Sequence, residues 1–101
     1  MDIADVREEI DALDEAIVRL ISQRQRWVTE AGKLKQDSGA VRAPDRVAKV
    51  IGRVRAVAET TGASPDVVER TYRAMIDAFI DLELSVHAAV SEPGNAASTE
   101  A

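Results

Sequence analysis

Cysteine is absent from this 101-residue chain, histidine occurs once, and tryptophan, tyrosine and phenylalanine occur once each. Without cysteine there is no disulfide framework, iron–sulfur cluster or thiolate-bound haem, and a single histidine cannot complete a Cys/His zinc site. The fold must therefore be stabilised by packing alone. We expect a protein suited to a reducing compartment, hence cytoplasmic, that uses neither a metal nor a cofactor.

Long apolar runs and an excess of basic residues are also missing. No run approaches the ~20 apolar residues of a membrane span, and the first ten residues are acidic and periodic where a signal peptide is basic and then apolar. Acidic side chains number 18 and basic ones 13, which gives a net charge of −5. We expect one small domain with no membrane or nucleic-acid partner.

A heptad pattern fills the first third of the chain. Its apolar residues, in steps of three and four, are Ile3, Val6, Ile10, Leu13, Ile17, Leu20, Trp27, Ala31 and Leu34. The pattern predicts one helix that Gly32 alone need not end before the stop signal Asp37-Ser38-Gly39. Such a helix is roughly 50 Å long, whereas a compact chain of this size has a radius of gyration of about 13 Å.

Two shorter helices are predicted in the rest of the chain. Ala43-Pro44-Asp45 opens one, and Thr60-Thr61-Gly62 closes it. Ser64-Pro65-Asp66 is a typical start for the other, which continues to about Val90. A loop over residues 37–43 lets the second helix fold back over the first.

The predicted fold is therefore all-α, a three-helix protomer over residues 1–90. Residues 91–101 are small and polar and are expected to form a disordered tail. The long first helix has no partner of equal length in its own chain. We therefore predict an intertwined helical homodimer, in which two chains pack their long helices together.

Two cations interrupt the apolar pattern of the first helix. Arg24 occupies a heptad position that calls for an apolar residue, and a buried Arg without a partner costs several kcal/mol. Lys35, eleven residues on, falls within about 20° of the same helix face. Either both face an anionic ligand, or Arg24 pairs with an acid of the bundle and Lys35 is solvated.

Four more residues complete the candidate set from the residues alone. Arg7 lies about 25 Å from Arg24 along the helix, so an antiparallel partner chain would have to bring it near. Arg46 stands in the first turn of the second helix, and Glu83 borders the seam of the third one turn beyond Phe79. The plain alternative for Arg46 and Glu83 is a solvated surface position. His87 has no Ser, Cys or second ligand beside it, which favours an ordinary flanking residue.

In order and spacing these segments resemble the AroQ-type chorismate mutase family, whose members are all-helical dimers. The similarity covers roughly residues 3 to 88. It rests on VREEIDALDEAIVRLISQR, AGKLK, VRAPDRVAKVI and YRAMIDAFIDLEL. The resemblance implies an intertwined dimer with the chorismate mutase II-like fold.

The resemblance also assigns roles. It implies that Arg24, with Arg7 of the other subunit, holds the substrate carboxylates. Lys35 would contact a carboxylate and the ether oxygen of the enolpyruvyl side chain, to which Glu83 would donate a hydrogen bond while protonated. Arg46 matches the arginine of the family's second helix. Val47 and Phe79 complete the expected substrate-binding set.

The function implied is that of a chorismate mutase, an isomerase that converts chorismate to prephenate by a concerted rearrangement. At Val47 many mutases have a Glu that binds the ring hydroxyl of the substrate. The run APDRVA also resembles isochorismate-pyruvate lyase, a carbon–oxygen lyase that forms salicylate and pyruvate. A mutase for 4-amino-4-deoxychorismate remains a third alternative. A dimeric helical scaffold, or a regulatory subunit acting with a larger enzyme of the shikimate pathway, is the non-enzymatic one.

Overall fold

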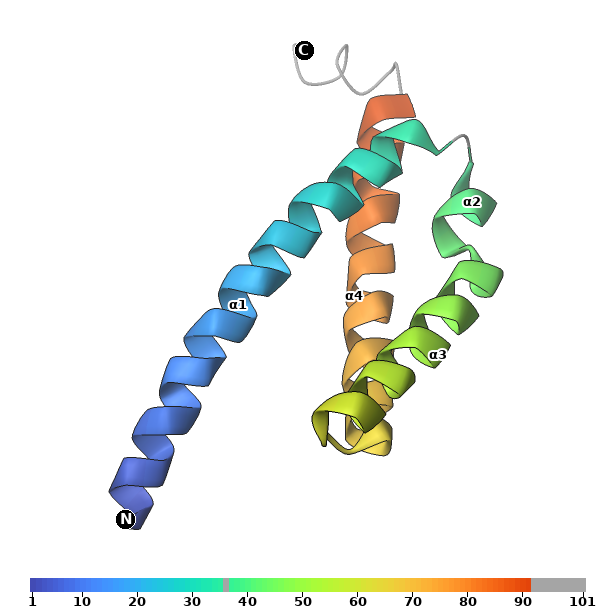
Figure 1. The fold of residues 1–101 in the computed structure, drawn as a ribbon. Coiled ribbons are helices and arrows are strands. Elements are labelled where there is room, and N and C mark those ends of the chain that lie inside the picture. Colours follow the sequence, from blue (N-terminus) through green and yellow to red (C-terminus); the bar gives the residue numbers. More distant parts are fainter. Residues whose placement is uncertain (36, 92–101) are drawn as a thin grey trace, which may run out of the picture.

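The computed structural model describes residues 1–35 and 37–91. Of the tail predicted over residues 91–101, Ser91 is the last residue of the final helix, and residues 92–101 lie outside the described part. Four helices follow one another without a strand in this part of the chain: α1 (Ile3–Leu34), α2 (Ser38–Arg42), α3 (Pro44–Thr61) and α4 (Pro65–Ser91) (Figure 1). The all-α prediction with three long helices is confirmed. His87 falls within α4, and its side chain is not among those described.

Local sequence explains most of the helix ends. Asp2 caps α1 through a reciprocal pair of hydrogen bonds with Asp5. Gly62 ends α3 with a φ of 84°, a left-handed conformation that glycine adopts without steric cost. Ser64 Oγ then accepts a hydrogen bond from the Val67 N–H at the start of α4.

Two predictions about the first connection were wrong. α1 ends at Leu34, because Lys35 already has an extended backbone as the C-cap, so the helix is 32 residues long. The expected loop over residues 37–43 contains the five-residue helix α2, capped by the Asp37 carboxylate on the Ala40 N–H. The physical reason for the second difference is that Asp37 acts as an N-cap, so a new helix begins directly after it.

α4 is the element on which α1, α2 and α3 all pack. The N-terminal half of α1 diverges from this bundle and extends beyond it (Figure 1). The radius of gyration is 17.8 Å and the longest extent is 61 Å, against about 13 Å for a compact chain of this length. None of the helices in the described ranges combines the length and apolar character that crossing a membrane requires.

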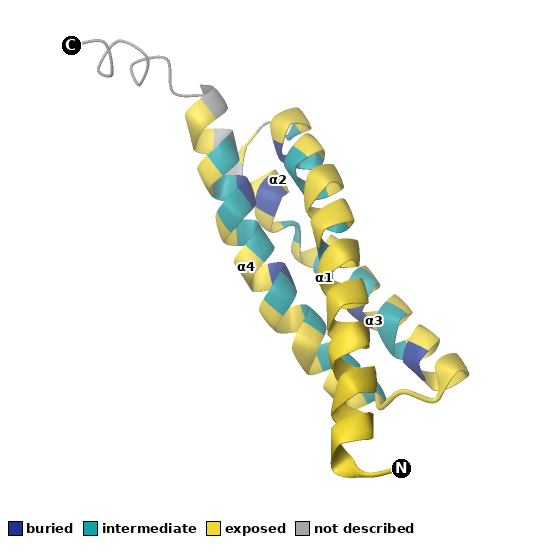
Figure 2. Ribbon diagram, turned by 90° about the vertical axis from the view of Figure 1, so that its left-hand side faces the viewer, coloured by how far each residue is buried: buried dark blue, intermediate teal, exposed yellow. Residues whose placement is uncertain are grey.

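Burial follows the bundle that α2, α3 and α4 form with the C-terminal part of α1. The buried apolar side chains in the described part are Val41, Ile51, Ala58 and Ile76, contributed by α2, α3 and α4. Residues 3–20 of α1 are all exposed (Figure 2). Its heptad stripe is therefore uncovered, with Leu13 61% and Leu20 62% exposed. No described residue outside α1 covers this part of the stripe.

Candidate active site

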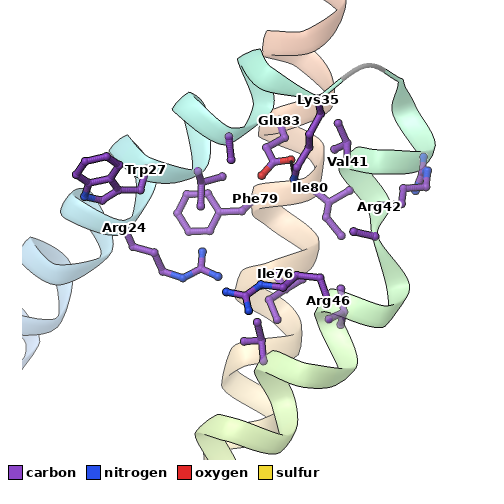
Figure 3. A pocket seen from close by; sticks show the side chains of 15 residues that line it. Arg24, Trp27, Lys35, Val41, Arg42, Arg46, Ile76, Phe79, Ile80 and Glu83 are labelled. Carbon is purple, nitrogen blue, oxygen red and sulfur yellow. Dashed lines mark hydrogen bonds and ion pairs between the residues drawn. The ribbon is translucent and has the colours of Figure 1, made fainter.

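A pocket of about 310 Å³ opens where the C-terminal third of α1 faces α2, the start of α3 and the second half of α4 (Figure 3). Apolar side chains of α2, α3 and α4 form its walls, among them Val41, Val50 and Ile80. Its charged lining residues are Arg24, Lys35, Arg42, Arg46 and Glu83. Four cations thus face one carboxylate.

The structure brings together six of the seven residues in the expected substrate-binding set. Arg7 is the exception, since it lies on the diverging half of α1 and is exposed. Seventeen residues of helix separate it from Arg24, or about 25 Å at 1.5 Å per residue. The six that line the pocket are Arg24, Lys35, Arg46, Val47, Phe79 and Glu83.

Lys35 and Glu83 form an ion pair inside the pocket. The Lys35 Nζ donates to Glu83 Oε2 at 2.8 Å. The side chains are 27% and 9% exposed, so both charges are partly removed from water. Glu83, which the sequence places at the border of the apolar seam of α4, is therefore buried. The lysine reaches it from the C-cap of α1 and not from within the helix.

Gly32 allows this approach of α1 to α4. It is the buried residue of α1, and a Cβ built on it would lie 3.4 Å from Glu83 Cγ and 3.8 Å from Glu83 Cα. A larger side chain here would meet the Glu83 stem. Gly32 has a low helix propensity, but its lack of a side chain sets the distance between α1 and α4 behind the pocket.

Arg24 is half-buried, and its guanidinium lies over the Phe79 ring with Cζ 5.2 Å from the centroid. Its Nη1 atom is buried and has no hydrogen-bond partner among the described residues. A buried donor without an acceptor costs about 1–3 kcal/mol. The sequence left two partners open for Arg24, an anionic ligand or an acid of the bundle. In the described part of the chain, no acidic side chain pairs with this nitrogen.

The start of α3 contributes Arg46, which is exposed at the edge of the pocket. Just before it, Ala43 has a φ of 35°, a left-handed conformation that costs a residue with a Cβ roughly 1 kcal/mol. This turn joins α2 to α3 and brings Arg42 and Val41 to the same pocket.

Sequence reasoning missed Arg42 and Trp27 as lining residues. Arg42 was assigned to a loop, and Trp27 was counted as part of the heptad stripe although it also reaches the pocket. No rule of sequence spacing separates these two pocket-lining residues from ordinary surface residues. The basic side chain two residues before Pro44 was the one available signal, because it adds a cation to the segment that leads to Arg46.

This arrangement suits a small anion with two charged groups. Arginine and lysine donate to carboxylates at several positions, and low water access strengthens each contact. Among the described residues, no three acidic or imidazole side chains are grouped so that they could hold a metal ion. The chain's own net charge is negative, but the local field of four neighbouring cations decides what the pocket binds.

Comparison with known proteins agrees with this geometry. Residues 6–84 match the family model described as chorismate mutase type II. The chain is 33% identical over 78 residues to the isochorismate pyruvate lyase of Pseudomonas aeruginosa, a match that covers 77% of both proteins. It is 35% identical over 72 residues to the T-protein of Haemophilus influenzae, covering 70% of this chain.

The T-proteins are much longer than this chain. The match spans 19% of the Haemophilus influenzae protein and 18% of the T-protein of Enterobacter agglomerans, which is 33% identical over 69 residues. The family model extends from the diverging half of α1 to the residue after Glu83, so it includes every candidate residue from Arg7 onward. The chain belongs to the chorismate mutase type II family.

Proposed function

We propose that this protein is a chorismate mutase that rearranges chorismate to prephenate. The observation that carries the proposal is the Arg24 guanidinium, which lines the pocket with a buried and unpaired Nη1. A substrate carboxylate would supply the missing acceptor. The other pocket cations offer donors for the second carboxylate of the same molecule.

The reaction requires no nucleophile. Chorismate is a flexible dianion that must adopt a compact, chair-like conformer before its carbon–oxygen bond breaks and the new carbon–carbon bond forms. Cations fixed on three helices would hold that conformer, which supplies part of the acceleration. Negative charge then accumulates on the breaking ether oxygen, and donors aimed at it stabilise the transition state more than the ground state.

Lys35 and Glu83 are the donors we assign to that oxygen. Because Lys35 Nζ and Glu83 Oε2 lie 2.8 Å apart, one substrate oxygen can contact both groups. Lys35 donates as a cation, whereas Glu83 donates only in its protonated form. Val47 and the apolar walls would exclude water from the bound ring.

The complete site needs a second copy of the chain. A groove between α3 and α4 adjoins the pocket, shares Arg24, Arg46 and Val50 with it, and is otherwise mainly apolar. The uncovered stripe on the N-terminal half of α1 offers the matching apolar surface. We assign the groove to this half of α1 from a partner, which would carry the partner's Arg7 toward the substrate carboxylates.

Charge complementarity supports this occupant. Residues 2–15 carry seven acidic side chains and one Arg. The groove is lined by Arg24, Arg46 and Arg53 and by no acidic residue of the described part. Opposite potentials of this kind favour the antiparallel arrangement of two identical chains.

Isochorismate-pyruvate lyase activity is the second candidate function. Val47 favours it, because an apolar side chain in the pocket cannot accept a hydrogen bond from a ring hydroxyl. The relative named as a lyase is also similar over 77% of both chains. A 4-amino-4-deoxychorismate mutase would use the same cations.

Product identification decides among these functions. The protein is incubated separately with chorismate, isochorismate and the 4-amino analogue of chorismate, and the products are separated by chromatography. We expect prephenate from chorismate, and Arg24→Gln should lower its rate at least about a hundredfold. The control Arg26→Gln changes an exposed arginine of α1 outside the pocket. If the protein formed salicylate and pyruvate from isochorismate and left chorismate unchanged, it would be a lyase and our assignment as a mutase would be wrong.

No conversion of any of the three would favour the scaffold or a regulatory subunit. In that case the same assay is repeated with a larger enzyme of the shikimate pathway present. Activity that appears only in the mixture would identify the subunit role.

A complementation experiment tests the shared site. Arg7→Ala and Arg24→Gln variants are each expected to be inactive. After exchange of subunits, a heterodimer has one intact site, with Arg7 from one chain and Arg24 from the other. The mixture should regain about a quarter of the wild-type activity, since half of the dimers are mixed and each has one working site. No recovery, or a monomer in sedimentation analysis, would overturn the dimeric site.

A further inference from the structure

Phe79 is the aromatic residue that contacts the Arg24 guanidinium. The two side chains come from different helices, α4 and α1, and Cζ lies 5.2 Å from the ring centroid (Figure 3). This distance is within the ~6 Å range of cation–π attraction. Both residues are half-buried and both line the pocket.

Within the described ranges, Phe79 is the one aromatic ring on which the Arg24 guanidinium stacks. No ion pair involving Arg24 occurs among the described residues, and its Nη1 lacks a hydrogen bond. An arginine side chain has about 2 kcal/mol of rotamer entropy to lose when it is ordered. A flat, weakly hydrated guanidinium can be ordered by stacking on a ring, which leaves its N–H groups unused.

We propose that Phe79 is a positioning residue that acts through Arg24. Its ring holds the guanidinium at the pocket before substrate arrives, and leaves the buried Nη1 available for a carboxylate. This inference rests on the proposed binding of a dicarboxylate. It assigns to Phe79 a task other than direct contact with the substrate.

The position of Phe79 on α4 gives this role a structural consequence. Phe79 lies one turn before Glu83, and both line the same pocket. One helix therefore orders two polar groups that reach over from α1, Arg24 by stacking and Lys35 by an ion pair. Any displacement of α4 relative to α1 would disturb both.

Two variants separate stacking from simple space filling. Phe79→Leu keeps an apolar side chain and removes the ring face, whereas Phe79→Tyr keeps the ring. The measurement is the dissociation constant of a rigid bicyclic dicarboxylate by calorimetry, together with KM and kcat for the substrate. We expect Phe79→Leu to raise Kd and KM about fivefold with kcat nearly unchanged, and Phe79→Tyr to match the wild type.

A double-mutant cycle tests whether the effect passes through Arg24. In an Arg24→Gln background, Phe79→Leu should leave the dissociation constant unchanged, because there is no guanidinium left to hold. In the matched Arg26→Gln background it should keep its fivefold effect, since Arg26 is an exposed neighbour outside the pocket. Equal effects of Phe79→Leu in both backgrounds would overturn the proposal.

A spectroscopic measurement on the unaltered protein covers the case in which Phe79→Leu does not fold. Protons of the Arg24 side chain beneath the ring should show an upfield ring-current shift by NMR, which the Arg26 protons lack. Absence of this shift refutes the stacked guanidinium. Failure of the proposed function gives a different result, because the wild-type protein would then bind no dicarboxylate at all, whether or not the ring-current shift is present.

Discussion

Lys35 and Glu83 are 48 residues apart in the sequence, and their side chains meet at 2.8 Å in the pocket. The pair joins the C-cap of α1 to the C-terminal third of α4. In the function proposed above, one substrate oxygen would touch both groups. The two charges of the pair are partly removed from water.

Glu83→Gln and Glu83→Ala should differ in activity. A glutamine keeps the length of the side chain and can donate a hydrogen bond, whereas alanine offers no donor. We expect kcat/KM of Glu83→Gln to stay within about tenfold of the wild type and that of Glu83→Ala to fall at least about a hundredfold. Steady-state kinetics of the two variants measure this. Equal losses in both variants would remove Glu83 as a donor to the ether oxygen.

Arg24→Met should separate stability from activity. The substitution removes a buried donor that has no acceptor, and the new thioether can pack on the Phe79 ring. We expect a gain of about 1 kcal/mol in the free energy of unfolding and a loss of activity of at least about a hundredfold. Urea unfolding and steady-state kinetics measure the two quantities. A less stable variant would contradict the view that the unpaired Nη1 of Arg24 lowers the stability of the folded protein.

Substitutions at Gly32 should depend steeply on size. An alanine Cβ would stand 3.4 Å from Glu83 Cγ, which is ordinary contact, and alanine favours helix by up to about 1 kcal/mol. Leucine would push against the Glu83 stem, with an expected cost of about 1–3 kcal/mol and a reduced rate.

Gly52 provides the matched control for this series. It lies on α3, and a Cβ built there has nothing within 4 Å. Gly52→Leu should therefore leave both the unfolding free energy and kcat/KM close to those of Gly52→Ala. If Gly32→Leu behaved like Gly52→Leu, the close packing of α1 on Glu83 would not exist in solution.

The long helices were predictable because their signals are local. Heptad spacing from Ile3 onward, Pro44 at the start of α3, and Ser64 before α4 each determine structure within a few residues. The length of the first helix also predicted a second copy of the chain, and this stays a prediction. The exposed stripe is the surface that such a copy would cover.

The rest depended on contacts that sequence spacing does not encode. Ala43 adopts a left-handed conformation that glycine and asparagine adopt more readily. An alanine at this position therefore gave no sequence signal for the turn after α2. Arg42 reaches the pocket only because of that turn. The Lys35 side chain was expected on a helix face, yet it is the extended C-cap that directs it to Glu83.

Far from the pocket, Glu69 on α4 should make stability depend on pH. Its pKa is lowered by hydrogen bonds from Arg73 at 2.7 Å and then from Arg55 at 2.9 Å, partly offset by desolvation. A carboxyl whose pKa is lower in the folded state stabilises the fold above its unfolded pKa. That contribution is lost as pH falls through the folded pKa.

Glu69→Gln removes the titrating group and keeps the shape of the side chain. We expect its melting temperature to lie below that of the wild type at pH 7, and the difference to shrink below about pH 4 as the wild-type carboxylate takes up a proton. Thermal unfolding from pH 2 to pH 8 measures this. Glu59→Gln is the control, because Glu59 is exposed on α3 and forms no ion pair in the described part of the chain. A difference for Glu69→Gln that stayed constant down to pH 2 would mean that the arginine contacts seen on α3 and α4 contribute through packing and not through charge.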